Sequence, residues 1–244
     1  MDYAGRAQQR LVDRGFSLRV DGDFGAKSLA ALMSWTGGRP MVSQLRTDLG
    51  AAAARHFPAA GIATPLRLAH ALAQQSVETG GFTQMVESLN YSPKALRATF
   101  GQHRISDADC RRLGRQEGEK TVPVARQKDI ADLVYGGKWG RENLGNTQAG
   151  DGWRFRGRGA KQTTGRANYA SVAAVTGLDV LARPELLEDP DTGMKAACIF
   201  WRERGCNPIA DADDVTALTI RINGGRNGLE GRKAAMDRAR EILL

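Results

Sequence analysis

Two glutamates, Glu78 and Glu87, are the residues of this sequence best placed for acid–base chemistry. They lie in the stretch Leu72–Ser92, where a helical pattern stops at the glycine pair that follows Glu78. Two carboxylates in unlike environments can hydrolyse a glycosidic bond, because one protonates the leaving oxygen while the other activates water. The connection between them is long enough to fold back, so we expect Glu87 to face Glu78 across a groove.

A helix is predicted from about 65 to 79. Pro65 stands near its start, and Gly80 and Gly81 follow its end. Apolar residues recur at helical spacing at Ile62, Leu66, Ala69, Leu72 and Ala73. Glu78 then falls in the last turn, where the helix dipole and unpaired carbonyls favour the protonated carboxyl. A raised pKa suits a general acid. An arbitrary pair of glutamates is more commonly solvated at the surface, and the surrounding sequence is what favours an active site here.

The composition is that of an ordinary globular protein. The 244 residues, 41% hydrophobic and 25% charged, fit a small module plus a main domain. The apolar runs are too short to cross a bilayer, and the N-terminal MDYAGRAQQR has no apolar region of a secretory signal. We therefore expect synthesis in the cytosol, with release by another factor if the protein acts outside the membrane.

The net charge of +8 and the pI near 9.7 indicate attraction to a polyanion. Nucleic acid, anionic polymers of a bacterial wall and a membrane surface all fit, since the 35 Lys and Arg are scattered along the chain. Charge alone does not choose among these partners.

The cysteines and histidines predict neither a disulfide framework nor a metal site. Three cysteines would leave one unpaired, which favours a reducing compartment. No Cys/His set has zinc spacing, and each histidine is isolated in the sequence. The residues concerned are Cys110, Cys198, Cys206, His56, His70 and His103. We expect no cofactor.

The first 37 residues read as two short helices, the first ending at Gly15, joined through a DGDFG turn that tucks Phe24 between them. This segment resembles the type 1 peptidoglycan-binding domain. The matching residues are Gln9, Leu11, Gly15, Val20, Asp21, Gly22, Asp23, Phe24, Gly25, Leu29 and Leu32. The resemblance implies wall binding through Asp21, Gly22 and Phe24, with residues 1–38 as a module and 39–244 as the catalytic domain. The alternative is a helical hairpin that caps the main domain.

The rest of the chain predicts a mainly α fold, because no strand alternation stands out. Helices are expected over 41–56, in NYSPKALRATFG, in ISDADCRRLGR, in VARQKDIADLVYGG and in GRANYASVAAVTG. Further helices are expected from Pro190 to Gly205, after Asp213 as N-cap, and over 229–244. Residues 114–124 read as an exposed connection. The basic last helix is expected to pack on the core rather than to act on membranes.

The segment Lys138–Tyr169 mixes Gly, Arg, Trp, Phe and Asn without regular periodicity. This composition is typical of a binding surface on irregular backbone, where aromatic rings stack on sugars or bases and arginines bind anions. Its glycine spacing is not that of a phosphate loop, so nucleotide binding is poorly supported.

Five motifs in order, ETGGF, ESLNYS, GDGWRFRGRG, QTTGRANY and INGG, resemble the glycoside hydrolase family 19 chitinase-like domain, in particular its branch in phage endolysins. The resemblance spans roughly residues 60–240. It implies an α-rich, lysozyme-like architecture of two lobes with a substrate cleft, and an inverting mechanism without metal or cofactor. Such a mechanism needs carboxyl groups roughly 6.5–9.5 Å apart.

The resemblance assigns roles to particular residues. Glu78 matches the general acid, Glu87 matches the second carboxylate of the endolysin branch, and Thr164 matches a Ser or Thr that holds the nucleophilic water. The positions that match sugar-contacting or cleft-supporting residues are Tyr91, Gln162, Asn168, Asn223 and Arg232.

The sequence also departs from the family pattern. Lys161 and Thr163 stand where the family usually has apolar residues, and Val77 precedes the acid where a histidine is common. These departures alter the surroundings of the acid without deleting a catalytic group. Asp151 is a further acidic residue in the glycine-rich segment, which leaves the identity of the base open.

The function predicted from these features is that of an endolysin, a muramidase that cuts peptidoglycan glycan strands for host lysis. We expect a monomer that reaches the wall, in the periplasm, after holin-mediated release. Its partners would be peptidoglycan and an anionic outer-membrane surface, with no nucleic acid. The enzymatic alternatives are a chitinase and a lytic transglycosylase, which needs one acid and forms an anhydro product. Non-catalytic alternatives are a wall-binding protein and a basic nucleic-acid-binding protein.

Overall fold

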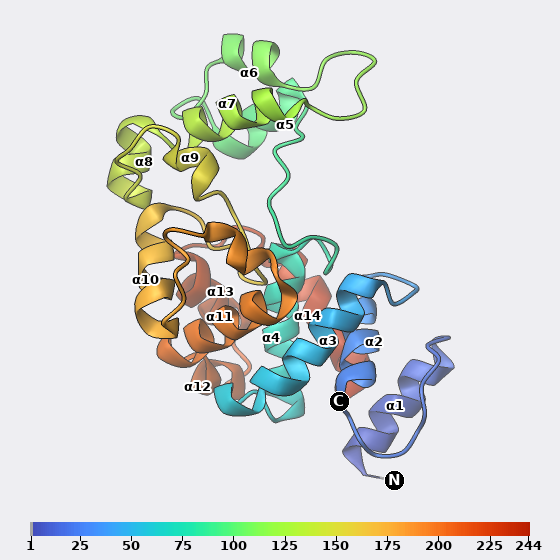
Figure 1. The fold of residues 1–244 in the computed structure, drawn as a ribbon. Coiled ribbons are helices and arrows are strands. Elements are labelled where there is room, and N and C mark those ends of the chain that lie inside the picture. Colours follow the sequence, from blue (N-terminus) through green and yellow to red (C-terminus); the bar gives the residue numbers. More distant parts are fainter. Residues whose placement is uncertain (1) are drawn as a thin grey trace. The chain divides into compact units, whose positions relative to one another are not determined.

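The computed structural model describes residues 2–244, which fold into helices and connecting loops (Figure 1). Within this range there is no β-strand, only isolated bridges, so the predicted mainly α fold class is confirmed. The chain forms two compact units. Unit 1 comprises 2–85, Gly159–Lys161 and Leu187–Leu244, and unit 2 comprises Val86–Arg158 and Gln162–Leu186. No helix in the described range is long and apolar enough to span a membrane.

Unit 1 is built around α4, which packs against α14, α12 and α2 (Figure 1). The helices of this unit are α1 (Tyr3–Asp13), α2 (Ala26–Thr36), α3 (Gln44–His56), η1 (Pro58–Ala60), α4 (Pro65–Glu78), α11 (Pro190–Glu203), α12 (Cys206–Asp211), α13 (Val215–Asn223) and α14 (Leu229–Leu243), with η2 (Pro184–Glu188) at the junction with unit 2. α4 begins as predicted, because the Thr64 hydroxyl caps the N–H of Arg67 and Pro65 occupies the first turn. The inward face of α4 is fully buried, with Leu72 inaccessible to solvent.

The N-terminal pair α1 and α2 is tied to the DGDFG turn by Gln8, a buried residue of α1. Its amide nitrogen donates to Asp21 Oδ1 (2.9 Å), and its carbonyl oxygen accepts from the N–H of Gly22 (2.9 Å). Phe24 packs against the core, with its ring 6.2 Å from that of Tyr3. α2 packs on α3 and α14, so these helices share the core of unit 1. A domain boundary after residue 38 stays a prediction.

Unit 2 has its own apolar core, which includes Leu89, Leu96, Ile130 and Val134. Its helices are α5 (Pro93–Phe100), α6 (Asp107–Leu113), α7 (Val124–Val134), α8 (Gly137–Leu144), α9 (Asp151–Arg154) and α10 (Arg166–Thr176). The N-caps of α5 and α6 are Ser92 and Ser106, as serine side chains before helical patterns suggest. Residues between α6 and α7 form the predicted connection.

Two local predictions were wrong. The N-cap of α13 is Asp214, not Asp213, because the Asp214 carboxylate accepts the N–H of Ala217 while Asp213 binds His70 and Arg240. The segment Lys138–Tyr169, expected to be irregular, contains most of α8 and all of α9.

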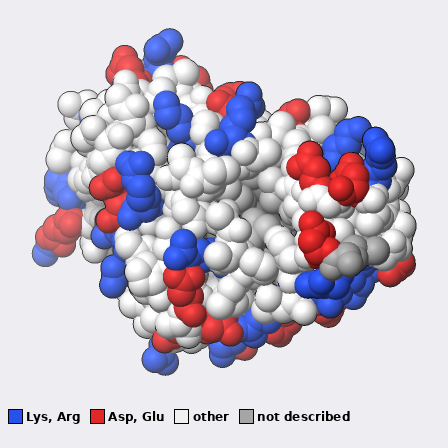
Figure 2. All heavy atoms as spheres, turned by 90° about the horizontal axis from the view of Figure 1, so that it is seen from below, with Lys and Arg blue, Asp and Glu red and all other residues white. Residues whose placement is uncertain are grey.

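Charged side chains of both signs are visible on one face of the molecule. On the face shown in Figure 2, Lys and Arg lie in small groups interspersed with Asp and Glu rather than in one basic region. The three cysteines are free and buried.

Candidate active site

Glu78 lies in the last turn of α4, as predicted, and the chain leaves the helix in a tight turn. Thr79 closes the helix, since its hydroxyl donates to Gln75 O (2.7 Å) and accepts the N–H of Phe82 (3.0 Å). Gly80 and Phe82 both have positive φ values, 58° each, and Phe82 is fully buried. Burying this ring anchors the turn and fixes the direction of the helix end that carries the acid.

The carboxylate of Glu78 contacts two side chains that come from far along the chain. Arg232, from α14, donates a hydrogen bond from Nη2 to Oε1 and forms an ion pair there. In the amide orientation that satisfies both neighbours, Asn223 Nδ2 donates to Glu78 Oε1 (3.2 Å) and its Oδ1 accepts from Arg232 (2.8 Å). The structure thus brings together three of the sequence-predicted site residues.

Arg232 is held rigidly. Only 1% of its surface is exposed, its Nε donates to Gln74 Oε1 (2.6 Å) and its Nη1 donates to Asn227 O (2.8 Å). A guanidinium bound on three sides cannot swing away from Glu78, so it sets the position of the carboxylate.

A small pocket of about 20 Å³ lies against Glu78, with room for about one water molecule. Its lining includes Gln75, Lys161, Phe200 and Ile222. The Gln75 side chain is 8% exposed, and its Oε1 finds no hydrogen-bond partner within the described part of the chain. This oxygen is an acceptor available to a donor on a bound molecule.

The pKa of Glu78 is raised from its ordinary value, mainly because burial disfavours the charged carboxylate. The positive charges of Arg232 and Lys161 and the hydrogen bond from Asn223 act in the opposite direction and do not cancel it. The predicted direction is confirmed. Its main cause is desolvation rather than the helix end that the sequence suggested.

Glu87 belongs to unit 2 and follows Val86, which pairs with Arg158 in an isolated antiparallel bridge. Its N–H donates to Gly157 O (2.8 Å), and its Oε2 accepts the N–H of Gly157 (3.2 Å). The Tyr135 hydroxyl donates to Glu87 Oε1 (2.5 Å). Both carboxylate oxygens therefore have donors, which orient the group.

Burial raises the pKa of Glu87 as well, and the hydrogen bonds from Tyr135 and Gly157 favour the carboxylate and oppose the shift. Desolvation beside this carboxylate raises the pKa of Tyr135 well above its usual value and that of Tyr91 to about 12. Both phenols stay protonated, so Tyr135 remains a donor to Glu87. That Glu87 faces Glu78 across a groove stays a prediction.

The turn after Arg158 places Gln162 and Thr164 next to Glu87. A methyl group built on Gly157 would lie 2.8 Å from Gln162 Oε1, 3.2 Å from Glu87 Cβ and 3.3 Å from Thr164 Oγ1. Thr164 Oγ1 donates to Gln162 O (3.0 Å), and Gln162 adopts a positive φ of 53°. A side chain at 157 would therefore crowd Gln162, Glu87 and Thr164.

Two further residues of unit 2, Tyr91 and Asn168, were predicted to contact the sugar chain. Tyr91 is half-buried, and its ring packs edge-on against Phe100 with centroids 5.6 Å apart. Asn168 is exposed on α10, where its Nδ2 donates to Thr164 O (2.7 Å). Asn168 therefore supports the backbone that carries Thr164.

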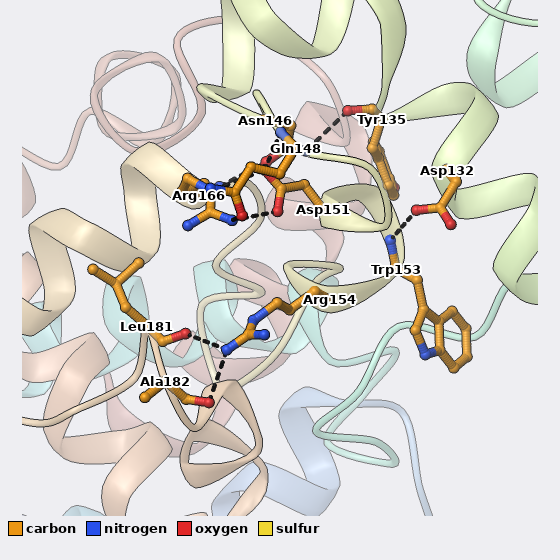
Figure 3. A network of polar contacts seen from close by, with 10 residues as sticks. All are labelled: Asp132, Tyr135, Asn146, Gln148, Asp151, Trp153, Arg154, Arg166, Leu181 and Ala182. Atoms are coloured by element: carbon orange, nitrogen blue, oxygen red, sulfur yellow. Dashed lines mark hydrogen bonds and ion pairs between the residues drawn. The ribbon is translucent and has the colours of Figure 1, made fainter.

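Asp151, the alternative base, has a structural role in unit 2 (Figure 3). It is buried, and Arg166 binds both of its oxygens, with 2.8 Å between Nε and Oδ2 and 2.5 Å between Nη2 and Oδ1. Burial alone would raise its pKa, but the hydrogen bonds from Arg166 and the N–H of Gln148 hold it below the ordinary value. A carboxylate occupied in this way is poorly placed to take a proton from water.

A pocket of about 190 Å³ lies at the DGDFG turn, and one of the three predicted wall-binding residues, Asp21, belongs to its lining. Asp21 lines it and is exposed, while Gly22 forms the turn with a φ of 81°. Phe24 instead packs against the apolar core of unit 1.

No group of three His, Cys, Asp or Glu side chains that could hold a metal ion occurs among residues 2–244. Sequence reasoning missed Tyr135 and Gln75. Tyr135 directly precedes the glycine pair that ends α7, and only its distance to Glu87 reveals its role. Gln75 stands one helical turn before Glu78, a spacing that could have indicated a shared face.

The chain is 33% identical over 174 residues to a glycosyl hydrolase family 19 domain-containing protein of Haemophilus influenzae, an alignment that covers 71% of this chain and 78% of that protein. No model of a known protein family matches.

Two solved structures share the fold. Chitinase C from Streptomyces griseus HUT6037 superposes with a TM-score of 0.54 at 18% identity, covering 91% of this chain and 95% of that one. A mutant of chitinase C gives 0.53 at 17% identity with the same coverage. At this level of identity the likeness shows the fold alone.

Proposed function

The chain belongs to glycosyl hydrolase family 19 and is a glycoside hydrolase, and from this premise we propose that it cuts the glycan strands of bacterial peptidoglycan. In this proposal it is an endolysin with muramidase activity and an inverting mechanism. The observation that carries the proposal is the environment of Glu78, a buried carboxyl with a raised pKa, held by Arg232 and Asn223.

The lining of the pocket beside the acid offers a hydrogen-bond acceptor to an N-acetylated sugar. Gln75 Oε1 is a buried acceptor without a partner in the described chain, and the N–H of an acetamido group or a sugar hydroxyl would satisfy it. Peptidoglycan and chitin both carry such groups. The DGDFG module and the net charge of +8 support the anionic wall polymer over chitin.

In the proposed mechanism, protonated Glu78 donates its proton to the glycosidic oxygen as the bond to the anomeric carbon breaks. Water attacks that carbon from the opposite face, and Glu87 accepts the proton that the water loses. Burial favours the protonated form of Glu78 before the step, and Arg232 stabilises the carboxylate that forms. Tyr135 and the N–H of Gly157 stabilise the ionised form of Glu87.

Thr164 positions the attacking water in this proposal, with Gln162, Asn168 and Tyr91 supporting or contacting the sugar chain. The module with Asp21, Gly22 and Phe24 holds the protein on the wall. We further propose that the protein acts as a monomer in the periplasm after release by a holin, and that its basic charge favours contact with an anionic outer-membrane surface.

Mass spectrometry of soluble fragments released from purified sacculi tests the proposal, with wild type and Glu78→Gln side by side. We expect reducing N-acetylmuramic acid ends from the wild type and none from the variant, because an amide cannot donate the required proton.

Other products would change the conclusion. Anhydro ends would indicate a lytic transglycosylase and remove the water-activating role of Glu87. Release of no fragments would refute the proposed substrate, and chitin oligomers and DNA would then be tested with the same pair of proteins.

A further inference from the structure

A cluster of cations surrounds Phe200, a residue of α11 that lines the pocket beside Glu78. Lys161 Nζ lies 4.1 Å from the centroid of the Phe200 ring, and Arg204 Cζ lies 5.2 Å from it. The charge of Lys161 interacts with that of Arg204 and with that of Glu78. The face of this ring therefore holds two positive groups next to the general acid.

Arg221, on α13, extends the cluster. Its Nη1 donates to Arg204 O (2.8 Å). Arg204 and Arg221 line an open hollow of about 590 Å³, together with the apolar side chains of Ile209, Ala217, Ile220 and Ile222. Ile222 also lines the pocket of Glu78, so the hollow and the pocket share one wall.

Ion pairing distinguishes these three cations from their neighbour Arg202 within the described residues. None of Lys161, Arg204 and Arg221 forms an ion pair within residues 2–244, whereas the neighbouring Arg202 pairs with Glu203 (3.0 Å). Like charges that lie close together repel, and partial burial adds a desolvation cost to Lys161. An anionic ligand would offset both effects.

The hollow combines these cations with exposed apolar surface, including Ile220 at 42% exposure. A peptide that contains alanine methyl groups and free carboxylates complements such a surface in both respects. Peptidoglycan carries such peptides on its muramyl residues, and chitin carries none.

We propose, on the basis of the proposed function, that the surface of Lys161, Arg204 and Arg221 around Phe200 binds the carboxylate-bearing peptide of a muramyl residue near the scissile bond. The surface thereby selects peptide-bearing glycan over bare glycan.

The test compares two soluble substrates, glycan strands with uncrosslinked peptides and the same strands stripped of peptides by an amidase. The measured quantity is the ratio of kcat/KM for the two substrates. The double variant Arg204→Gln/Arg221→Gln should lower this ratio about tenfold, since each lost charge-assisted contact costs a few-fold in binding. Raising the salt to about 0.5 M should lower the wild-type ratio in the same direction.

Arg202→Gln is the matched control, because it removes the same charge from the same region of α11 without touching the hollow. Its ratio should equal that of the wild type. An unchanged ratio in the active double variant, or an equal loss on both substrates, would overturn the inference alone. If the wild type cuts neither substrate, the proposed function fails and the inference falls with it.

Discussion

Replacing Arg232 by methionine is the sharpest probe of the acid. The side chain is buried and in contact with Glu78, so the variant removes the cation that stabilises the carboxylate. Two unit charges about 4 Å apart attract by about 4 kcal/mol at an effective dielectric constant of about 20, which corresponds to about three pKa units. Measured acid–arginine pairs shift by about one to three units. We therefore expect the pKa of Glu78 to rise by that amount.

The sign follows from the role of each group. A general acid works only when protonated, so activity falls as the pH rises through the pKa of Glu78. This alkaline limb of the pH profile of kcat/KM should move to higher pH in Arg232→Met. The other limb, set by ionisation of Glu87 in unit 2, should stay in place. Lys233→Met is the control, because it removes a neighbouring exposed cation of α14 that pairs with Glu230.

Arg232→Met will also lower the melting temperature, since Gln74 Oε1 and Asn227 O each lose a donor. The profile must therefore be measured below the unfolding transition. Arg232→Lys retains the charge and should leave the limb near its wild-type position while lowering kcat/KM. An alkaline limb that stays in place or moves downward in Arg232→Met would refute Glu78 as the titrating acid.

Three further outcomes are expected. Tyr135→Phe removes a hydrogen bond to the carboxylate of Glu87, which raises the pKa of Glu87. The acidic limb of the pH profile should move to higher pH by about one to two units. An unmoved limb would exclude Glu87 as the base. Asp151→Asn should destabilise the fold by about 2–4 kcal/mol in a urea titration, because Arg166 loses a buried partner. The folded fraction should keep the wild-type kcat, and a large loss of kcat would make Asp151 the base after all. Gly157→Ala should lower kcat about tenfold at an almost unchanged melting temperature, because the added methyl group crowds Gln162, Glu87 and Thr164 and shifts them from their positions.

The helices could be predicted from the sequence where their signals are local. Pro65 and Pro190 mark the starts of α4 and α11 correctly, because a proline in the first turn of a helix is a local signal. At Asp213 the N-cap prediction was wrong. Two adjacent aspartates compete for the cap, and the structure assigns Asp213 to His70, a residue of α4 distant in sequence.

The glycine-rich segment shows the opposite limitation. Its apolar pattern does not extend far enough for a helix to be recognised. α8 and α9 nevertheless form there, because neighbouring residues provide stabilising hydrogen bonds. Asp132 of α7 accepts the N–H of Trp153 (2.9 Å), and Asn146 Nδ2 donates to Tyr135 O (2.9 Å), as Figure 3 shows. Short helices of this kind are stabilised by tertiary contacts that no local pattern encodes.

The cause of the raised pKa of Glu78 could not be predicted from its neighbours in the sequence. Position in the last turn of a helix gave the right direction, but an exposed helix end shifts a carboxyl only slightly. The larger increase in the pKa of Glu78 comes from burial beside residues of α11, α13 and the Gly159–Lys161 segment. The charge of Arg232 on α14 lowers the same pKa. Because these elements are far apart in sequence, their balance depends on the packing of unit 1. A substitution in its core that loosens α14 against α4, such as Met236→Ala, should therefore move the alkaline limb of the pH profile even though Met236 is buried in the core.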